Sequence, residues 1–165
     1  MNEEAPYALA LSGDYQRAAA LDQEFGRRNP NSTLSNSFTR PRAQAAIALG
    51  QHRPDEAIAI LQPALPSRLR TLDVPTLLGQ AYLELKQPER AAAEFTEVLD
   101  HRGVDALDPW YPLAYIRLAR ALRMQGQIQA SRSTYEQFFK FWADADPDIP
   151  MLALARRQYA GLPAQ

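Results

Sequence analysis

The amino-acid sequence predicts an all-α fold, in which about four antiparallel helix pairs stack into a right-handed solenoid and one further helix caps its C-terminal end. Turn-forming residues interrupt the chain at regular intervals, and an alanine-led amphipathic stretch follows each of them. The small residue that opens each stretch recurs with spacings of 39, 34 and 40 residues, at Ala18, Ala57, Ala91 and Ser131. Such a period is typical of helical hairpins that bury their apolar faces against their neighbours.

The first hairpin is expected over about residues 3–30 of a single domain that spans residues 1–165. Gly13 and Asp14 form its turn, and Ala18 opens its second helix. Pro6 falls where the first helix should already be running, and a proline inside a helix removes a backbone hydrogen bond. We therefore expect a short first helix, because the end unit of an array is often atypical.

The second hairpin is expected over about residues 38–66. Pro41 stands near the first turn of its first helix, where a missing N–H costs nothing, and Pro75 has the same place in the third hairpin. The spacing in excess of 34 residues falls at residues 29–39, which are rich in Asn and Ser. This segment is therefore expected to be an inserted loop.

The third hairpin, over about residues 73–101, matches the repeat pattern best. Its first helix carries L-G-x-x-Y, and its second carries A-x-x-x-F-x-x-V. Gly79 and Ala91 are small at the places where the two helices should approach most closely, and Tyr82 and Phe95 are the bulky residues beside them. Apolar residues three and four apart share a helix face, so this pattern predicts a packed helical pair.

The fourth hairpin is expected over about residues 112–141, opened by Pro112 and preceded by an insertion at residues 102–110. A capping helix is expected over about residues 148–161, with Asp148 as its N-cap residue. One face of that helix carries an apolar stripe at Leu152, Ala155 and Tyr159.

Composition excludes several classes of function. The net charge of −1 gives no strong field toward nucleic acid or an anionic membrane, so we expect neither as a partner. Cysteine is absent, which excludes disulfides and thiol chemistry. The sequence contains no apolar run long enough for a membrane span and no signal-type leader, so we expect a soluble domain, in the cytoplasm or outside it. Arginine outnumbers lysine by 16 to 2, which is typical of a GC-rich genome; a functional arginine surface is the alternative.

No arrangement of residues indicates catalysis, a cofactor or a metal. Asp144, Asp146 and Asp148 alternate as in a calcium loop, but the required glycine and glutamate do not follow them. His52 and His101 are far apart in sequence, and neither has a nucleophile or a second ligand nearby. Carboxylate pairs such as Glu94 with Glu97 are expected on a solvated helix face. We therefore predict no enzyme activity for this segment.

Aromatic residues recur at helical spacings, and most of them are expected in the core. Trp110 and Tyr111 are different, because they lie on the expected insertion before a helix and are less easily buried. They are candidate contact residues. The aromatic residues expected in the core are Tyr7, Tyr82, Phe95, Tyr115, Tyr135, Phe138, Phe139 and Trp142.

The chain resembles tetratricopeptide repeat proteins over nearly its whole length, in the spacing of small and aromatic residues described above. Segments 100–104 and 142–150 also resemble stretches in the repeat regions that follow the catalytic domain of bacterial serine/threonine protein kinases. This narrower likeness implies a sensor or docking part of a bacterial signalling protein. No kinase motif occurs in the chain, so no kinase residue can be assigned.

The resemblance implies that the first helix of each pair lines a concave groove, which would bind a peptide or helix of a partner protein. Arg117, Arg120 and Met124 share one helix face there, and guanidinium groups pair with carboxylates, so an acidic peptide or a terminal carboxylate would suit the groove. Ala46, Asp73 and Leu77 replace several residues of the two-carboxylate clamp that chaperone-docking members use, so that clamp is absent. The predicted groove residues are Arg42, Thr76, Gln80, Glu84, Ile116, Arg117, Arg120 and Met124, beside Ala46.

The alternative to partner binding is a structural or assembly role, in which copies of the chain associate by stacking their repeats. The sequence leaves the oligomeric state and the identity of any partner open.

Overall fold

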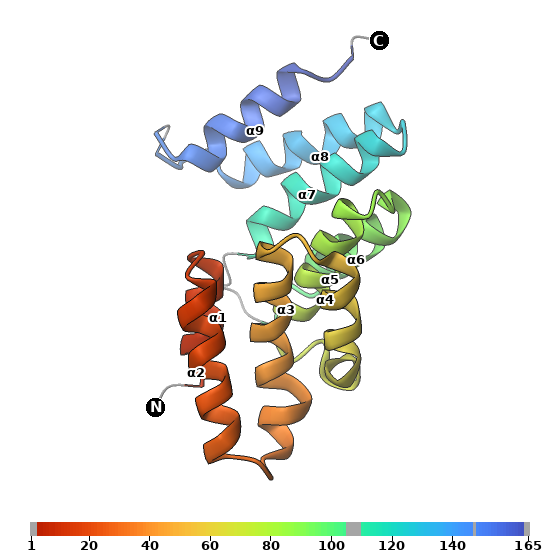
Figure 1. Cartoon of the computed structure of the whole chain (residues 1–165). Helices are drawn as coiled ribbons and strands as arrows, with labels where there is room; N and C mark the ends of the chain where they lie inside the picture. The colour runs from red at the N-terminus through yellow and green to blue at the C-terminus, as the bar shows by residue number, and fades with distance from the viewer. Residues whose placement is uncertain (1–2, 105–109, 147, 164–165) are drawn as a thin grey trace.

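The computed structural model describes residues 3–104, 110–146 and 148–163, and within these ranges it contains nine α-helices and no strand. Eight of the helices form four antiparallel pairs in chain order, and the ninth covers the last pair (Figure 1). In Figure 1 the helices α1 to α4 run upright, whereas α7 to α9 run across the top of the view. The predicted all-α architecture of stacked hairpins is confirmed.

The second helix of each pair packs against the first helix of the next pair, and the first helices also contact one another along the array. Two short segments, η1 and η2, flank the second pair. The elements are α1 (Ala5–Leu11), α2 (Tyr15–Arg28), η1 (Ser35–Thr39), α3 (Arg40–Gly50), α4 (Pro54–Leu61), η2 (Gln62–Ser67), α5 (Asp73–Glu84), α6 (Pro88–Asp100), α7 (Trp110–Met124), α8 (Ile128–Phe141) and α9 (Pro150–Ala160).

The four hairpin turns share one backbone feature. Each has a residue of positive φ five positions before the small residue that opens the second helix. These residues are Gly13 (φ 88°), His52 (φ 57°), Lys86 (φ 55°) and Gly126 (φ 76°). A left-handed residue ends a helix by reversing the chain direction, and glycine adopts it without steric cost. The repeat predicted from side-chain spacing is therefore present in the backbone as well.

The expected loop at residues 29–39 is only partly a loop, because the chain is already helical from residue 33. Residues Ser35–Thr39 form a π-helical turn, in which the N–H of Arg40 donates to the carbonyl of Ser35. Such a wide turn lets the chain continue into α3 although Pro41 has no N–H and its ring would crowd a regular helix. The expected loop at 102–110 lies partly outside the described residues, at 105–109.

The third pair packs as its sequence predicts. Phe95 is fully buried, and a Cβ atom placed on Gly79 would lie 2.6 Å from its ring, so only glycine allows this approach. Leu78, Tyr82 and Ala91 are also buried. The expected division into small residues at the crossing and bulky residues beside it is confirmed.

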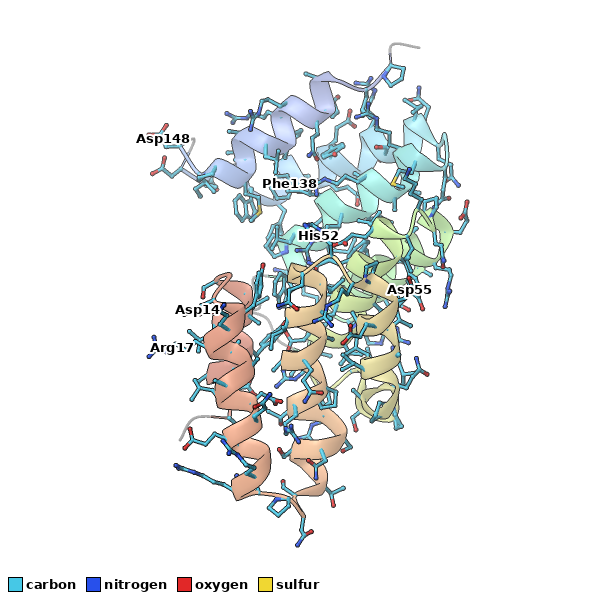
Figure 2. All side chains as sticks on the ribbon, in the orientation of Figure 1. Asp14, Arg17, His52, Asp55, Phe138 and Asp148 are labelled. Atoms are coloured by element: carbon cyan, nitrogen blue, oxygen red, sulfur yellow. The ribbon has the colours of Figure 1, made fainter. Side chains whose placement is uncertain are left out.

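The apolar core forms two clusters that meet at α7. The larger cluster runs from α1 to α7, and the smaller one joins α7, α8 and α9 around Phe138 (Figure 2). Tyr115 is partly buried and packs against both. Leu152 and Ala155 of α9 are buried in the smaller cluster, so α9 is the predicted capping helix.

One expectation for the C-terminal end is wrong. Asp148 does not cap α9: the N-cap residue is Ile149, and the side chain of Asp148 is exposed at the edge of the molecule (Figure 2). The backbone N–H of Asp148 donates to the carboxylate of Asp146 at 3.0 Å, so the aspartates shape the turn before the helix. Among the described residues, no helix has both the length and the apolar character that crossing a bilayer requires.

Candidate partner-binding groove

The first helices of the four pairs line one pocket of about 270 Å³. Most of its lining residues are apolar, its exposed surface is both polar and apolar, and its charged side chains are Arg117 and Glu84. Three of the predicted groove residues, Gln80, Glu84 and Arg117, line it, and so does Ala46. The full set of lining residues is Ala10, Leu11, Tyr15, Ala46, Leu49, Gly50, Leu77, Gln80, Glu84, Trp110 and Arg117.

Arg117 is a partly buried cation without an acidic partner among the described residues. Its guanidinium lies 5.0 Å from the ring centroid of Trp110, and both of its terminal nitrogens donate to the side-chain oxygen of Gln80 when that amide turns its oxygen toward them. No carboxylate of the described residues forms an ion pair with it. Burial, and then the neighbouring Arg120, lower the pKa of Arg117 to about 10, while Tyr7 acts in the opposite sense. The group is therefore charged at neutral pH and incompletely neutralised.

A buried carboxylate, Asp73, binds one of the residues that line the pocket, Trp110. Asp73 is 6% exposed and accepts four hydrogen bonds, which come from three other helices and a loop. The hydroxyl of Tyr7 donates at 2.9 Å and the indole N–H of Trp110 at 2.8 Å to one oxygen. Arg42 and the hydroxyl of Thr71 (2.9 Å) donate to the other oxygen. One side chain thus joins α1, α3, α5 and α7.

Arg42, a predicted groove residue, belongs to this buried network. It is 3% exposed, forms ion pairs with Asp73 and Glu4, and lies over the rings of Phe38 and Tyr7 at 4.6 and 5.4 Å. The sequence did not reveal this pairing, because Asp73 is 31 residues away from Arg42 and Glu4 is 38 residues away.

The structure divides the other predicted groove residues into two groups. Thr76 and Ile116 are buried at 1% and 2% exposure, so they contribute to packing inside the array. Trp110 and Tyr111, the candidate contact residues, are also held by packing: Trp110 binds Asp73, and Tyr111 is buried edge-on against Tyr115. The predicted residues with accessible side chains are Gln80, Glu84, Arg117, Arg120 and Met124.

Arg120 and Met124 line a second pocket of about 410 Å³, where α7 meets α9. The side-chain oxygen of Gln158, on α9, accepts from Nε of Arg120 at 2.9 Å and from the hydroxyl of Tyr135 at 2.8 Å. Burial raises the pKa of Tyr135, and the positive charges of Arg120 and Arg123 act against that rise. Arg123 is the remaining lining residue.

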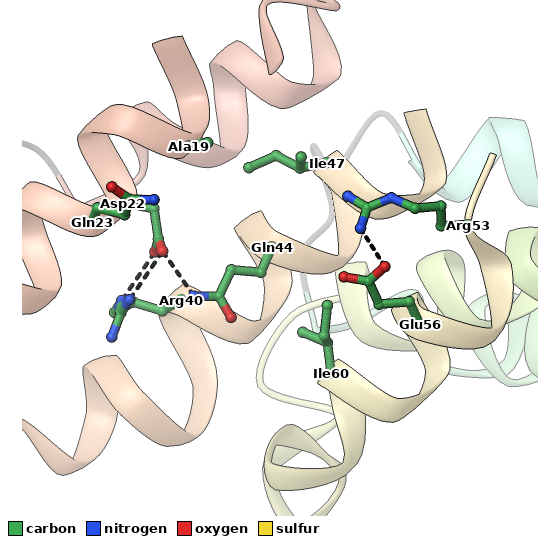
Figure 3. A pocket seen from close by; sticks show the side chains of 9 residues that line it. All are labelled: Ala19, Asp22, Gln23, Arg40, Gln44, Ile47, Arg53, Glu56 and Ile60. Carbon is green, nitrogen blue, oxygen red and sulfur yellow. Dashed lines mark hydrogen bonds and ion pairs between the residues drawn. The ribbon is translucent and has the colours of Figure 1, made fainter. Parts of the chain in front are cut away.

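A third pocket of about 270 Å³ lies between α2, α3 and α4 (Figure 3). Asp22 is buried there and accepts from Nε and Nη2 of Arg40, both at 3.0 Å, and from Gln44 at 2.7 Å. Arg53 and Glu56 pair on the opposite side. Every charged side chain that lines this pocket is paired, so the pocket has no unpaired charge with which to bind a ligand, whereas the groove has Arg117. Sequence reasoning missed it, since Asp22 belongs to the first repeat and its partners Arg40 and Gln44 belong to the second.

Chemistry-bearing groups elsewhere give no catalytic or metal arrangement. Within the described ranges, no three His, Cys, Asp or Glu side chains gather closely enough to hold a metal ion. The pair of Glu94 and Glu97 is not the solvated pair that we expected, because both carboxylates bind Arg68 from the loop before α5. Burial raises the pKa of Glu94, with Arg68 acting in the opposite sense.

Comparison with known proteins supports the repeat fold. Residues 113–144, which include most of α7 and α8, match the tetratricopeptide repeat family. Two crystal structures of nearly identical TPR-like repeats from a candidate kinesin light chain of Podosopora anserina are similar in fold. One of them, a single-residue variant, has a TM-score of 0.69 and the other structure one of 0.67; each is 18% identical and covers 96% of this chain. The match covers 81% and 82% of those chains, respectively.

No curated protein matches the sequence. The family match and the two structures indicate no catalytic family, and TPR-like repeats are typically non-catalytic scaffolds for protein–protein interaction. Neither comparison extends to the repeat regions of bacterial kinases.

Proposed function

We propose that this protein is an interaction scaffold that binds a peptide or helix of a partner protein in the groove formed by α1, α3, α5 and α7. The observation that carries the proposal is the pocket itself. Its lining comes from the first helices of all four pairs, so one partner segment can contact several repeats at once. Gln80, Glu84 and Arg117 are the polar groups that would orient such a segment.

The partner segment carries a carboxylate that binds Arg117. The support is electrostatic: the guanidinium is partly desolvated, its contacts are a neutral amide and an aromatic ring, and no described carboxylate pairs with it. A carboxylate can accept two parallel hydrogen bonds from a guanidinium, and such bonds are stronger than neutral ones. An acidic side chain or the C-terminal carboxylate of a peptide would supply it.

A peptide-display selection on the immobilised protein tests this proposal. The affinity of an enriched peptide is then measured for the wild type, for Arg117→Glu and for Arg17→Glu. Arg17 is exposed on α2 and extends away from the body of the molecule (Figure 2), so the control matches the charge change. We expect Arg117→Glu to weaken binding by about tenfold or more, because each tenfold corresponds to about 1.4 kcal/mol. Equal affinities of all three proteins would show that the groove is not the binding surface.

A finer proposal concerns context: the scaffold is a sensor or docking part of a bacterial signalling protein of the serine/threonine kinase type. Its support is the likeness of segments 100–104 and 142–150 to the repeat regions of such proteins. The native gene locus tests it directly. A kinase coding region in frame with this segment, or beside it, would support the proposal, and loci without one would count against it.

A further inference from the structure

Positive charge is concentrated at the C-terminal end of the array. Helices α7, α8 and α9 carry seven basic side chains and one acidic side chain, Glu136, while the loop before α9 carries three exposed aspartates. The net charge of −1 for the whole chain hides this asymmetry. Arg117, Arg120 and Arg123 follow one another at intervals of three residues on α7, and α7 contains no acidic residue. Residues three apart are neighbours on a helix surface, so these cations form one stripe.

The stripe ends in the pocket between α7 and α9. Arg120, Arg123 and the hydroxyl-bearing Tyr135 line it together with Gln158 and Met124. Nε of Arg120 donates to the side-chain oxygen of Gln158 at 2.9 Å, and the same guanidinium lies within hydrogen-bonding reach of the Tyr135 hydroxyl. No described carboxylate forms an ion pair with Arg120 or Arg123. The pocket therefore brings together two cations and, among the described residues, no anion.

We propose that this pocket binds a phosphorylated side chain of the partner segment that lies in the groove. The inference rests on the proposed function and adds a recognised modification to it. A phosphate group carries about −1.5 to −2 charges and three acceptor oxygens, which match two guanidinium groups better than one carboxylate does. The exposed thioether of Met124 provides an adaptable apolar contact for the neighbouring part of the segment.

The spacing of the arginines fits a segment that binds both pockets. Along the helix axis, Arg117 and Arg123 are about 9 Å apart, because each residue of an α-helix rises about 1.5 Å. Side chains two positions apart in an extended peptide are about 7 Å apart. A carboxylate at Arg117 and a phosphate at Arg120 and Arg123 would then lie two or three residues apart in the partner.

Fluorescence anisotropy with degenerate octapeptide libraries tests the inference. Three libraries are compared, with phosphoserine, serine or glutamate fixed at the centre, at low ionic strength. We expect the phosphoserine library to bind at least about tenfold more tightly than the serine library, and more tightly than the glutamate library, since charge-assisted hydrogen bonds are stronger than neutral ones. Arg123→Gln, at an exposed residue, should reduce this preference, and Arg120→Gln with Arg123→Gln should abolish it.

The control is Arg156→Gln with Arg157→Gln, which removes the same charge from exposed positions of α9 outside the pocket. It should retain the preference, and thermal melts should show that all variants are folded. Equal binding of the phosphoserine and serine libraries would overturn the inference alone, as would loss of the preference in the control. Complete displacement of the phosphoserine library by inorganic phosphate at the same concentration as the library would also overturn it, because the pocket would then be a site for the free anion. If no library binds, the groove proposal fails as well.

Discussion

At the scale of single residues, the contact between Gly79 and Phe95 determines how closely α5 and α6 approach. Phe95 is fully buried and has the ring that a side chain at position 79 would meet. We expect Phe95→Ala to lower the free energy of unfolding by about 3–5 kcal/mol, because the substitution leaves a cavity. Urea unfolding followed by circular dichroism measures this. A loss below about 1 kcal/mol would show that Phe95 is not a core residue.

Gly79→Ala tests the same contact from the other side. Alanine favours a helix more than glycine does, yet we expect this variant to lose about 1–3 kcal/mol because its methyl group meets the ring. In a Phe95→Leu background the clash is relieved, so the cost of Gly79→Ala should fall. Additive losses in the double variant would contradict a direct contact.

For one of the hairpin turns we predict a substitution that stabilises the protein. Lys86 is exposed and has φ 55°, a conformation that costs a non-glycine residue energy. Gly126 occupies the same position in the fourth hairpin, at φ 76°, with no atom near its missing Cβ. Lys86→Gly should therefore raise the thermal stability by about 0.5–1 kcal/mol, and Gly126→Ala should lower it by about 1 kcal/mol. A destabilised Lys86→Gly protein would show that this turn carries no strain.

At the scale of elements, the loop before α5 is held on α6 by Arg68. Its partner Glu94 has a pKa raised above the ordinary value of 4.5 by burial. In the pH range between 4.5 and that raised value, the folded state binds more protons than the unfolded state, so stability falls as the pH rises through this range. Glu94→Gln should flatten this fall, whereas Glu89→Gln, at an exposed position of the same helix, should not. Equal pH dependence of both variants would exclude Glu94 as the cause.

The elements also show what the sequence can reveal. The small residues at positions 18, 57, 91 and 131 placed all four turns, because each hairpin must bring its helices together at one point. The π-helical turn before Pro41 was missed, since proline is typical of a helix start and the turn that accommodates it has no sequence signature of its own. The residues that line the pocket with Arg117 come from α1, α2, α3, α5 and α7, and the partners of Arg42 and Asp22 lie in other repeats. Local periodicity carries no information about such pairings.

At the scale of the whole molecule, self-association by stacking of repeats would require an apolar surface at an end of the array. However, the exposed side chains of α9 are two alanines and two arginines, beside Pro150. We expect sedimentation velocity to show a monomer over a wide concentration range. A dimer that dissociates on dilution would favour the assembly role.

Asp73 forms hydrogen bonds with helices of the three other repeats, a connection that a simple array of repeats lacks. In a linear array each hairpin contacts only its neighbours, so mechanical tension between the ends would peel the hairpins away one at a time. Here one carboxylate ties α1, α3, α5 and α7 together. Under an optical trap we expect these hairpins of the wild type to release in a single step. Asp73→Asn should lower the equilibrium stability by at least about 3 kcal/mol, because it leaves Arg42 underpaired, and should divide the step into smaller ones. Asp55→Asn, on the exposed start of α4 (Figure 2), should keep the single step. A partner that pulls on one end of the protein would therefore meet a stiff unit, whereas an ordinary array of repeats extends gradually under force.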